Sequence, residues 1–290
     1  MKKLFRALLC AALLCTLLLT TAHADMGPKP SVRITLEGLD GSLCYGTLLS
    51  ERESTGPSSV WNGVAEHAQH SGNVDWAVLD EATWQAFVDY ADSDGYHFLQ
   101  EGWRVDETGQ LAWTYYPPSR FKILLYFPES GTFLSSDICE RYAFDSYFTA
   151  RLTTSGLVVE KSYNYSGELI SLGCRIVITI ALELALALLM GFRRKKPFIT
   201  IAAVNAVTQI ALNVMLNIIN YRSGYLAFMF NYVLLELLVL VIESVVFFLL
   251  LGRSGEERHK ITHILLYTLL ANALSFAAGF AVAKLLPGIF

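Results

Sequence analysis

The chain has 290 residues, 53% of them hydrophobic, and a formal net charge of −4 at pH 7. This modest value hides an asymmetry: residues 25–168 hold 21 acidic and 9 basic residues, a charge of about −12, whereas residues 169–290 hold 5 acidic and 10 basic residues, about +5. The acidic first part argues against nucleic acid or anionic lipid as its partner. The chain therefore divides near residue 168.

Residues 1–24 have the three parts of a secretory signal peptide. The basic start consists of Lys2, Lys3 and Arg6. An apolar stretch of 13 residues follows, and a small-x-small pattern ends at Ala24, so cleavage is expected between Ala24 and Asp25. The stretch is too short for a membrane span. The alternative is an uncleaved helix or signal anchor.

Residues 25–168 predict an exported, β-rich domain. Alternating apolar and polar residues predict strands over 32–37 and 142–152. Further short strands are predicted over 43–49, 98–105, 111–116, 121–127 and 156–163. The glycine-containing segments 38–41 and 106–109 predict hairpin turns between neighbouring strands.

One helix is predicted in this domain, over residues 81–91. Asp80 is placed to cap its start, and Trp84, Phe87 and Val88 fall on one face. Six or seven short strands with one helix predict a β-sandwich, immunoglobulin-like or prealbumin-like.

Cysteine content leaves one disulfide open. Cys174 falls in the first predicted membrane helix, so Cys44 and Cys139 are the only pair that could form a bond in the exported domain. An extracytoplasmic compartment permits the bond. The sequence favours neither the bonded nor the free form.

Motifs for catalysis or metal binding are not found in the sequence. Glu66, His67 and His70 are metal-ligand types, but the glutamate does not lie between the histidines as it does in a zinc-protease helix. No Gly-rich phosphate loop, nucleophile elbow or CxxC motif occurs. We therefore expect no cofactor, no metal and no enzymatic activity.

Four long apolar runs follow residue 168. They cover residues 169–192, 198–219, 227–251 and 261–285. At 1.5 Å per residue each is long enough to cross a hydrocarbon core of about 30 Å. The sequence predicts a multi-pass α-helical membrane protein, with a four-helix transmembrane bundle after the β-rich domain.

Basic residues orient the predicted spans. Two loops share most of them: Arg193, Arg194, Lys195 and Lys196 in one, and Arg253, Arg258 and Lys260 in the other. The positive-inside rule places these loops in the cytoplasm, with the N-terminal domain and the C-terminus on the outer side of the cell membrane. An aromatic belt at the outer interface is predicted from Tyr221, Tyr225, Phe228, Phe230 and Tyr232.

Each predicted span carries polar residues along one helical face. They are Arg175, Thr179 and Glu183; Asn205, Gln209, Asn213, Asn217 and Asn220; Glu236 and Glu243; and Thr268, Asn272, Ser275 and Gly279. Four such faces can meet in the interior of a bundle. Counting residues inward from the ends of each span gives the depth of these side chains in the membrane and predicts two layers. One is an outer-leaflet ion pair of Arg175 with Glu236, and the other is a midplane cluster of Glu183, Gln209, Glu243 and Asn272.

Two interpretations of the midplane cluster stay open. Amides and hydroxyls commonly hold membrane helices together, which is a structural role. Glu183 and Glu243 are harder to explain in this way, because two carboxylates in a low-dielectric interior cannot both be charged cheaply. A cation or proton pathway, or recognition of a polar ligand or partner helix, would use them.

The segments Tyr45-Gly46-Thr47-Leu48-Leu49-Ser50, Ser54-Thr55-Gly56-Pro57 and Ala271-Asn272-Ala273-Leu274-Ser275-Phe276 resemble uncharacterised bacterial envelope proteins. The resemblance implies a signal peptide, an exported domain and four C-terminal helices, and no known activity.

The leading hypothesis is a non-enzymatic protein of the lipid bilayer, whose exported domain binds a protein partner or small ligand. The alternative is a small transporter or channel for a solute, cation or proton that uses Glu183 and Glu243.

Overall fold

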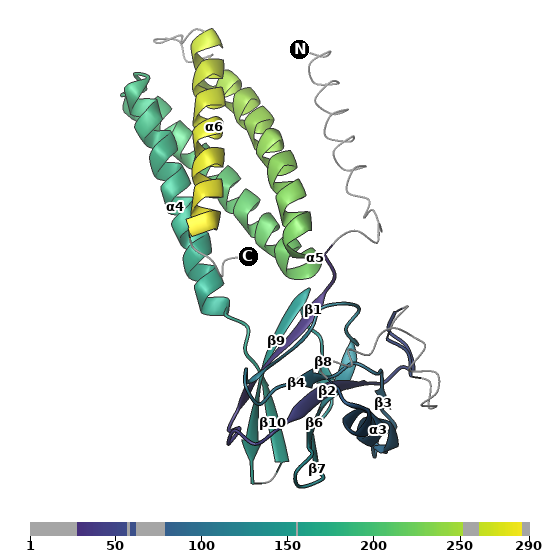
Figure 1. Ribbon diagram of the computed structural model, residues 1–290. Coiled ribbons are helices and arrows are strands. Elements are labelled where there is room, and N and C mark those ends of the chain that lie inside the picture. The colour runs from purple at the N-terminus through teal and green to yellow at the C-terminus, as the bar shows by residue number, and fades with distance from the viewer. Residues whose placement is uncertain (1–27, 57–58, 62–78, 155, 252–260, 286–290) are drawn as a thin grey trace. The chain divides into compact units, whose positions relative to one another are not determined.

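The computed structural model (Figure 1) describes residues 28–285 except for 57–58, 62–78, 155 and 252–260. It divides into two compact units, one spanning Pro28–Tyr163 and the other containing the helices from Asn164 onward. The predicted signal peptide, the His67 and His70 segment and the second basic loop lie outside the described residues.

The first unit is a β-rich domain with two sheets. One sheet has the order β10-β9-β1-β5, formed by Gly156–Lys161, Asp145–Thr153, Ser31–Glu37 and Gln110–Trp113. The other has the order β3-β2-β6-β7, formed by His97–Phe98, Tyr45–Ser50, Arg120–Phe127 and Thr132–Ser135. Two short strands complete the second sheet: β4 (Trp103–Arg104) pairs with β2, and β8 (Cys139–Glu140) pairs with β6.

The two sheets enclose the main hydrophobic core. Strand β1 buries Val32, Ile34 and Leu36 and exposes the residues between them, as the period of two predicts. Strand β6 is buried on both faces: Ile123 packs in the core between the sheets, and Leu124 packs on the opposite side. The domain therefore has a third layer outside the second sheet.

This third layer is the helix α3 (Glu81–Asp89). Its Trp84 and Phe87 pack on the outer face of the second sheet. The side chain of Asp80 accepts a hydrogen bond from the Thr83 amide at 2.7 Å, which satisfies one of the free donors at the helix start. The predicted helix and its cap are confirmed.

The predicted hairpins are wrong. Residues 38–41 join β1 to β2, and residues 106–109 join β4 to β5, but in both cases the two strands belong to different sheets. Strand β1 instead pairs in parallel with β9, with Ser31 opposite Asp145. The predicted strand 98–105 is divided because Gln100 has a positive φ of 65° and breaks it into β3 and β4.

Cys44 and Cys139 are separate thiols. Cys44 directly precedes Tyr45 at one end of β2, whereas Cys139 pairs with Phe121, which lies opposite Ser50 at the other end. Five residues of strand put about 17 Å between the two positions, far beyond the roughly 7 Å that a disulfide can span. Burial raises the pKa of the Cys44 thiol to about 12, so it is an unreactive core group.

The second unit contains α4 (Tyr165–Leu189), α5 (Lys195–Leu251) and α6 (Ile261–Leu285). Three helices here are long and apolar enough to cross a membrane, and their outer surface carries large exposed apolar side chains. Among them are Leu169, Ile170, Val177, Leu189, Val207, Phe230 and Leu269. This unit is therefore suited to a lipid environment.

Four separate membrane helices are not what the structure contains. The predicted loop around residues 220–226 is helical, and it joins the second and third apolar runs into the 57-residue α5. Gly224 alone departs from helical geometry, with φ 80° and ψ 177°, a region open to glycine. Two helices meet there, and α5 doubles back (Figure 1), with Leu216 and Phe228 in one hydrophobic cluster.

Candidate functional site

A seam of polar residues runs through the interior of the helical unit. We define this polar seam as Arg175, Thr179 and Glu183 of α4, Asn205, Gln209, Asn213, Glu236 and Glu243 of α5, and Thr268, Asn272 and Ser275 of α6. Every one of these residues is buried. The helical period of 3.6 places them on inward faces, so the unit has apolar side chains outside and polar ones inside.

Both carboxylate oxygens of Glu243 accept hydrogen bonds from other side chains of the helical unit. The Asn272 amide donates to Glu243 Oε2 at 2.6 Å, and the Thr208 hydroxyl donates to Oε1 at 2.6 Å. Asn272 also donates to the carbonyl of Thr268 at 3.0 Å, which fixes its orientation. These contacts join α5 to α6.

Glu183 is completely buried and less well satisfied. Gln209 Nε2 donates to Glu183 Oε1 at 3.2 Å, joining α4 to α5. Oε2 accepts no hydrogen bond from any side chain that the structure describes. The Tyr267 hydroxyl donates to the backbone carbonyl of Glu183 at 3.3 Å, and this bond links α6 to α4.

The structure thus brings the predicted midplane residues together as two hydrogen-bonded pairs, Glu183 with Gln209 and Glu243 with Asn272. Two further members, Thr208 and Tyr267, were not anticipated from the sequence. Thr208 lies three residues after Asn205 and Tyr267 directly precedes Thr268. A wider definition of each polar face would have included both.

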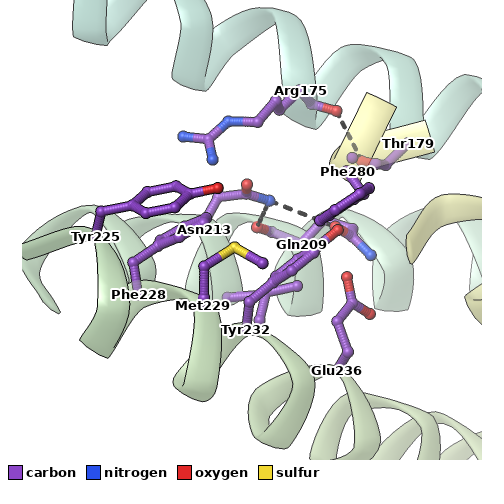
Figure 2. A pocket seen from close by; sticks show the side chains of 12 residues that line it. Arg175, Thr179, Gln209, Asn213, Tyr225, Phe228, Met229, Tyr232, Glu236 and Phe280 are labelled. Carbon is purple, nitrogen blue, oxygen red and sulfur yellow. Dashed lines mark hydrogen bonds between the residues drawn. The ribbon is translucent and has the colours of Figure 1, made fainter. Parts of the chain in front are cut away.

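A small cavity lies beside the seam (Figure 2). Its volume is about 20 Å³, and its lining includes Arg175, Gln209, Tyr232 and Glu236. A cavity of this size holds a single water molecule. This cavity therefore admits nothing larger than a water molecule.

The predicted ion pair between Arg175 and Glu236 is not formed. In Figure 2 the guanidinium of Arg175 extends to the left, toward Tyr225 and Asn213, whereas the carboxyl group of Glu236 lies to the lower right, below Gln209. Tyr225 precedes Glu236 by about 16 Å of helix. Because the second limb of α5 begins at Gly224, Arg175 faces the start of that limb, about three turns before Glu236.

The predicted aromatic belt is only partly at the surface. Phe230 and Tyr225 are exposed, at 69% and 52%, but Phe228 and Tyr232 are buried. The Tyr232 hydroxyl donates to the carbonyl of Phe276 at 3.0 Å, so this ring acts in packing between α5 and α6.

Two larger hollows lie in the β-rich domain. One, of about 310 Å³, includes Arg52, Arg120 and Arg141 in its lining. The other, of about 360 Å³, includes Asp92 and Lys122. Both approach the size of small-molecule sites, which the helical unit's cavity does not.

The Lys122 hollow contains a buried ion pair. Lys122 Nζ lies 2.8 Å from Asp92 Oδ1, and the two side chains are 5% and 1% exposed. Burial alone would raise the pKa of Asp92, but hydrogen bonds from Lys122, Tyr96 and Asp94 outweigh it and hold the pKa below its ordinary value. The pair connects β6, an internal strand of the second sheet, to the segment that follows α3.

Among the described acids of the β-rich domain, Glu101 has a strongly raised pKa. Burial raises its pKa to about 7, although the Ser59 hydroxyl donates to its carboxyl group at 3.0 Å. Gln100, with its positive φ, directly precedes it and donates to the Val60 carbonyl at 2.7 Å. This acid titrates near neutral pH.

No group of three or more His, Cys, Asp or Glu side chains suited to a metal ion occurs within the described residues. Comparison of the chain with family models, with curated proteins and with solved structures finds no match.

Proposed function

We propose that the protein is a non-enzymatic membrane protein whose β-rich domain binds a ligand or partner and whose helical unit anchors it in the bilayer. The observation that carries this proposal is the difference in open volume. The cavity among the described residues of the helical unit has room for about one water, whereas the β-rich domain has hollows of about 310 and 360 Å³.

The proposed anchor crosses the membrane four times, with α5 providing two of the crossings. A straight helix of 57 residues would extend about 86 Å, nearly three times the thickness of the hydrocarbon core. Divided at Gly224, each limb is about 40 Å long and suits one crossing. The basic segment from Arg193 to Lys196 favours a cytoplasmic position, and the proposed topology therefore has the β-rich domain on the outer side.

Within this proposal the polar seam holds the helices together. The bonds of Glu183 and Glu243 link α4, α5 and α6, and buried amide and hydroxyl groups serve this role in membrane helices. Transport through Glu183 and Glu243 is the rival function. It requires a wider interior than the cavity of about 20 Å³.

Site-specific photo-crosslinking in native membranes tests binding by the β-rich domain. A photoreactive amino acid at Ser54 or Ile138, which line the two hollows, is expected to give adducts or to be protected by a bound ligand. The same probe at Val158, exposed on β10, is the control. Equal behaviour at all three positions, with no ligand-induced change in melting temperature across a metabolite panel, would refute the proposal.

Flux measurements in proteoliposomes test the rival. Wild-type protein is expected to conduct protons and sodium no faster than protein-free liposomes. Flux that is clearly present and is lost in Glu243→Gln, but is kept in Glu160→Gln, would establish the transporter instead. Glu160 is an exposed residue of β10 and serves as the matched control.

A further inference from the structure

A cleft in the β-rich domain collects positive charge in an otherwise acidic region. We call it the arginine cleft; it is the hollow of about 310 Å³ whose lining includes Arg52, Ser54, Thr55, Tyr116, Arg120 and Arg141. Residues 25–168 contain only 9 basic residues against 21 acidic ones. Three of those nine line this cleft. A domain does not need to cluster its few basic residues in order to be soluble, so the clustering suggests a binding role.

Two of the three arginines lack a partner carboxylate. Arg120 is balanced, because it pairs with Glu51 at 2.7 Å and with Glu140 at 3.1 Å. Among the residues that the structure describes, no carboxylate lies within ion-pairing distance of Arg52 or Arg141. The cleft therefore has two positive charges available to a ligand.

Arg141 is the more unusual of the two, because it is half-buried. Burial lowers the pKa of its guanidinium, and only the charge of Asp145 opposes this shift. The Asp145 carboxylate accepts a hydrogen bond from the Ser31 hydroxyl, so part of its hydrogen-bonding capacity is already used. A desolvated guanidinium gains more from a bound anion than an exposed one does.

Other residues of the cleft lining are also held in defined positions. Tyr116 has a positive φ of 48°, a strained geometry for a residue with a side chain, and Lys29 Nζ lies 5.0 Å from the centre of its ring. A Cβ atom at Gly56 would come within 2.9 Å of that ring, so glycine allows the 51–56 segment to pack against it. The buried Thr55 hydroxyl has no hydrogen-bond partner among the described groups. Strain and an unused polar group are typical of binding sites.

We propose that the arginine cleft binds a small organic anion, whose carboxylate or phosphate group is held by Arg52 and Arg141 and whose remainder contacts Tyr116 and Thr55. The planar guanidinium donates two parallel hydrogen bonds that match either anion. A volume of about 310 Å³ suits a small molecule rather than a folded partner. This inference rests on the proposed function, because it names the ligand class of the same domain.

Isothermal titration calorimetry on the full-length protein in detergent tests the proposal. The probes are galacturonate as a carboxylate, glycerol 3-phosphate as a phosphate ester, and galactose as the neutral counterpart of the first. At least one anion is expected to bind and galactose is not. Arg141→Gln and Arg52→Gln are each expected to weaken anion binding roughly 10- to 100-fold, the loss typical of a charge-assisted hydrogen bond.

Controls separate lost binding from lost folding. Arg151→Gln changes an exposed arginine of β9 outside the cleft and is expected to leave anion affinity unchanged. Arg52 is exposed, so its variant remains informative if Arg141→Gln does not fold.

Three results would overturn the inference: no anion binds at millimolar concentration, galactose binds as well as galacturonate, or neither arginine variant changes affinity. Capture of a partner at Ile138 in that case would leave the proposed function standing.

Discussion

Removing the charge of Lys122 is expected to destabilise the β-rich domain strongly. Lys122→Met keeps most of the apolar stem beside Tyr96 but leaves the Asp92 carboxylate buried without its cation. Loss of one partner of a buried ion pair costs about 3–5 kcal/mol. The amides of Asp94 and Tyr96 still donate to Asp92, at 3.0 and 3.2 Å, which places the expected cost near the lower end, about 3 kcal/mol.

Tryptophan fluorescence of the full-length protein measures this effect without interference from the helices. All five tryptophans lie between Trp61 and Trp113 in the β-rich domain, so unfolding of the membrane unit contributes no tryptophan signal. A loss of about 3 kcal/mol should lower the midpoint of thermal unfolding by about 10 °C in a domain of this size. The double variant Lys122→Met with Asp92→Asn should recover part of the loss, because no buried charge then remains.

The matched control is Arg151→Met. Arg151 pairs with Glu37 at 2.7 Å, but the two side chains are 54% and 51% exposed. Exposed pairs contribute little to stability, because solvent screens both charges. A Lys122→Met variant that loses no more stability than Arg151→Met would refute the reasoning, because Asp92 would then not depend on its buried partner.

Three further predictions concern single side chains. Asp80→Ala removes the cap of α3 and should cost about 1 kcal/mol in urea unfolding followed by tryptophan fluorescence; no change would mean that the cap is dispensable. The pKa of Glu101 is about 7 in the folded protein against an ordinary 4.5. The protonated side chain therefore contributes its full stabilisation of the folded domain below pH 4.5, and this stabilisation is lost as pH rises to about 7. Wild-type stability should therefore fall by up to about 3 kcal/mol relative to Glu101→Gln across that range, and parallel pH profiles would contradict this. Gly279→Ala places a methyl group 2.4 Å from the Tyr232 hydroxyl and should lower the helical melting temperature measured by circular dichroism, whereas Gly173→Ala, with open space around it, should not.

Local features of the fold could be predicted from the sequence, and long-range pairing could not. The Asp80 cap and the alternation from Val32 to Leu36 depend on neighbouring residues, and both occur where the pattern places them. The hairpins failed because the turn segments pass between sheets, and glycine positions do not reveal which strand a neighbour pairs with. The parallel pairing of Ser31 with Asp145 has no local signal at all.

In the polar seam, too, local features could be predicted from the sequence and long-range contacts could not. Helical periodicity was enough to place Glu183, Gln209 and Glu243 on buried faces. The partner of Arg175 depended on where the second limb of α5 starts, and the sequence predicted a loop there instead of helix broken only at Gly224. A shift in that starting point changes which side chains meet across the unit.

The pairing of β1 with β9 sets the order in which the β-rich domain can fold during synthesis. Strand β1 lies between β9 and β5, so its pairing is complete on both sides only when Asp145 and the rest of β9 have been made. At about 5–20 residues per second, the ribosome needs roughly 6 to 23 s to add the intervening residues. Until β9 is complete, one edge of β1 has unpaired backbone groups, and a chaperone that binds nascent chains would protect this edge from aggregation.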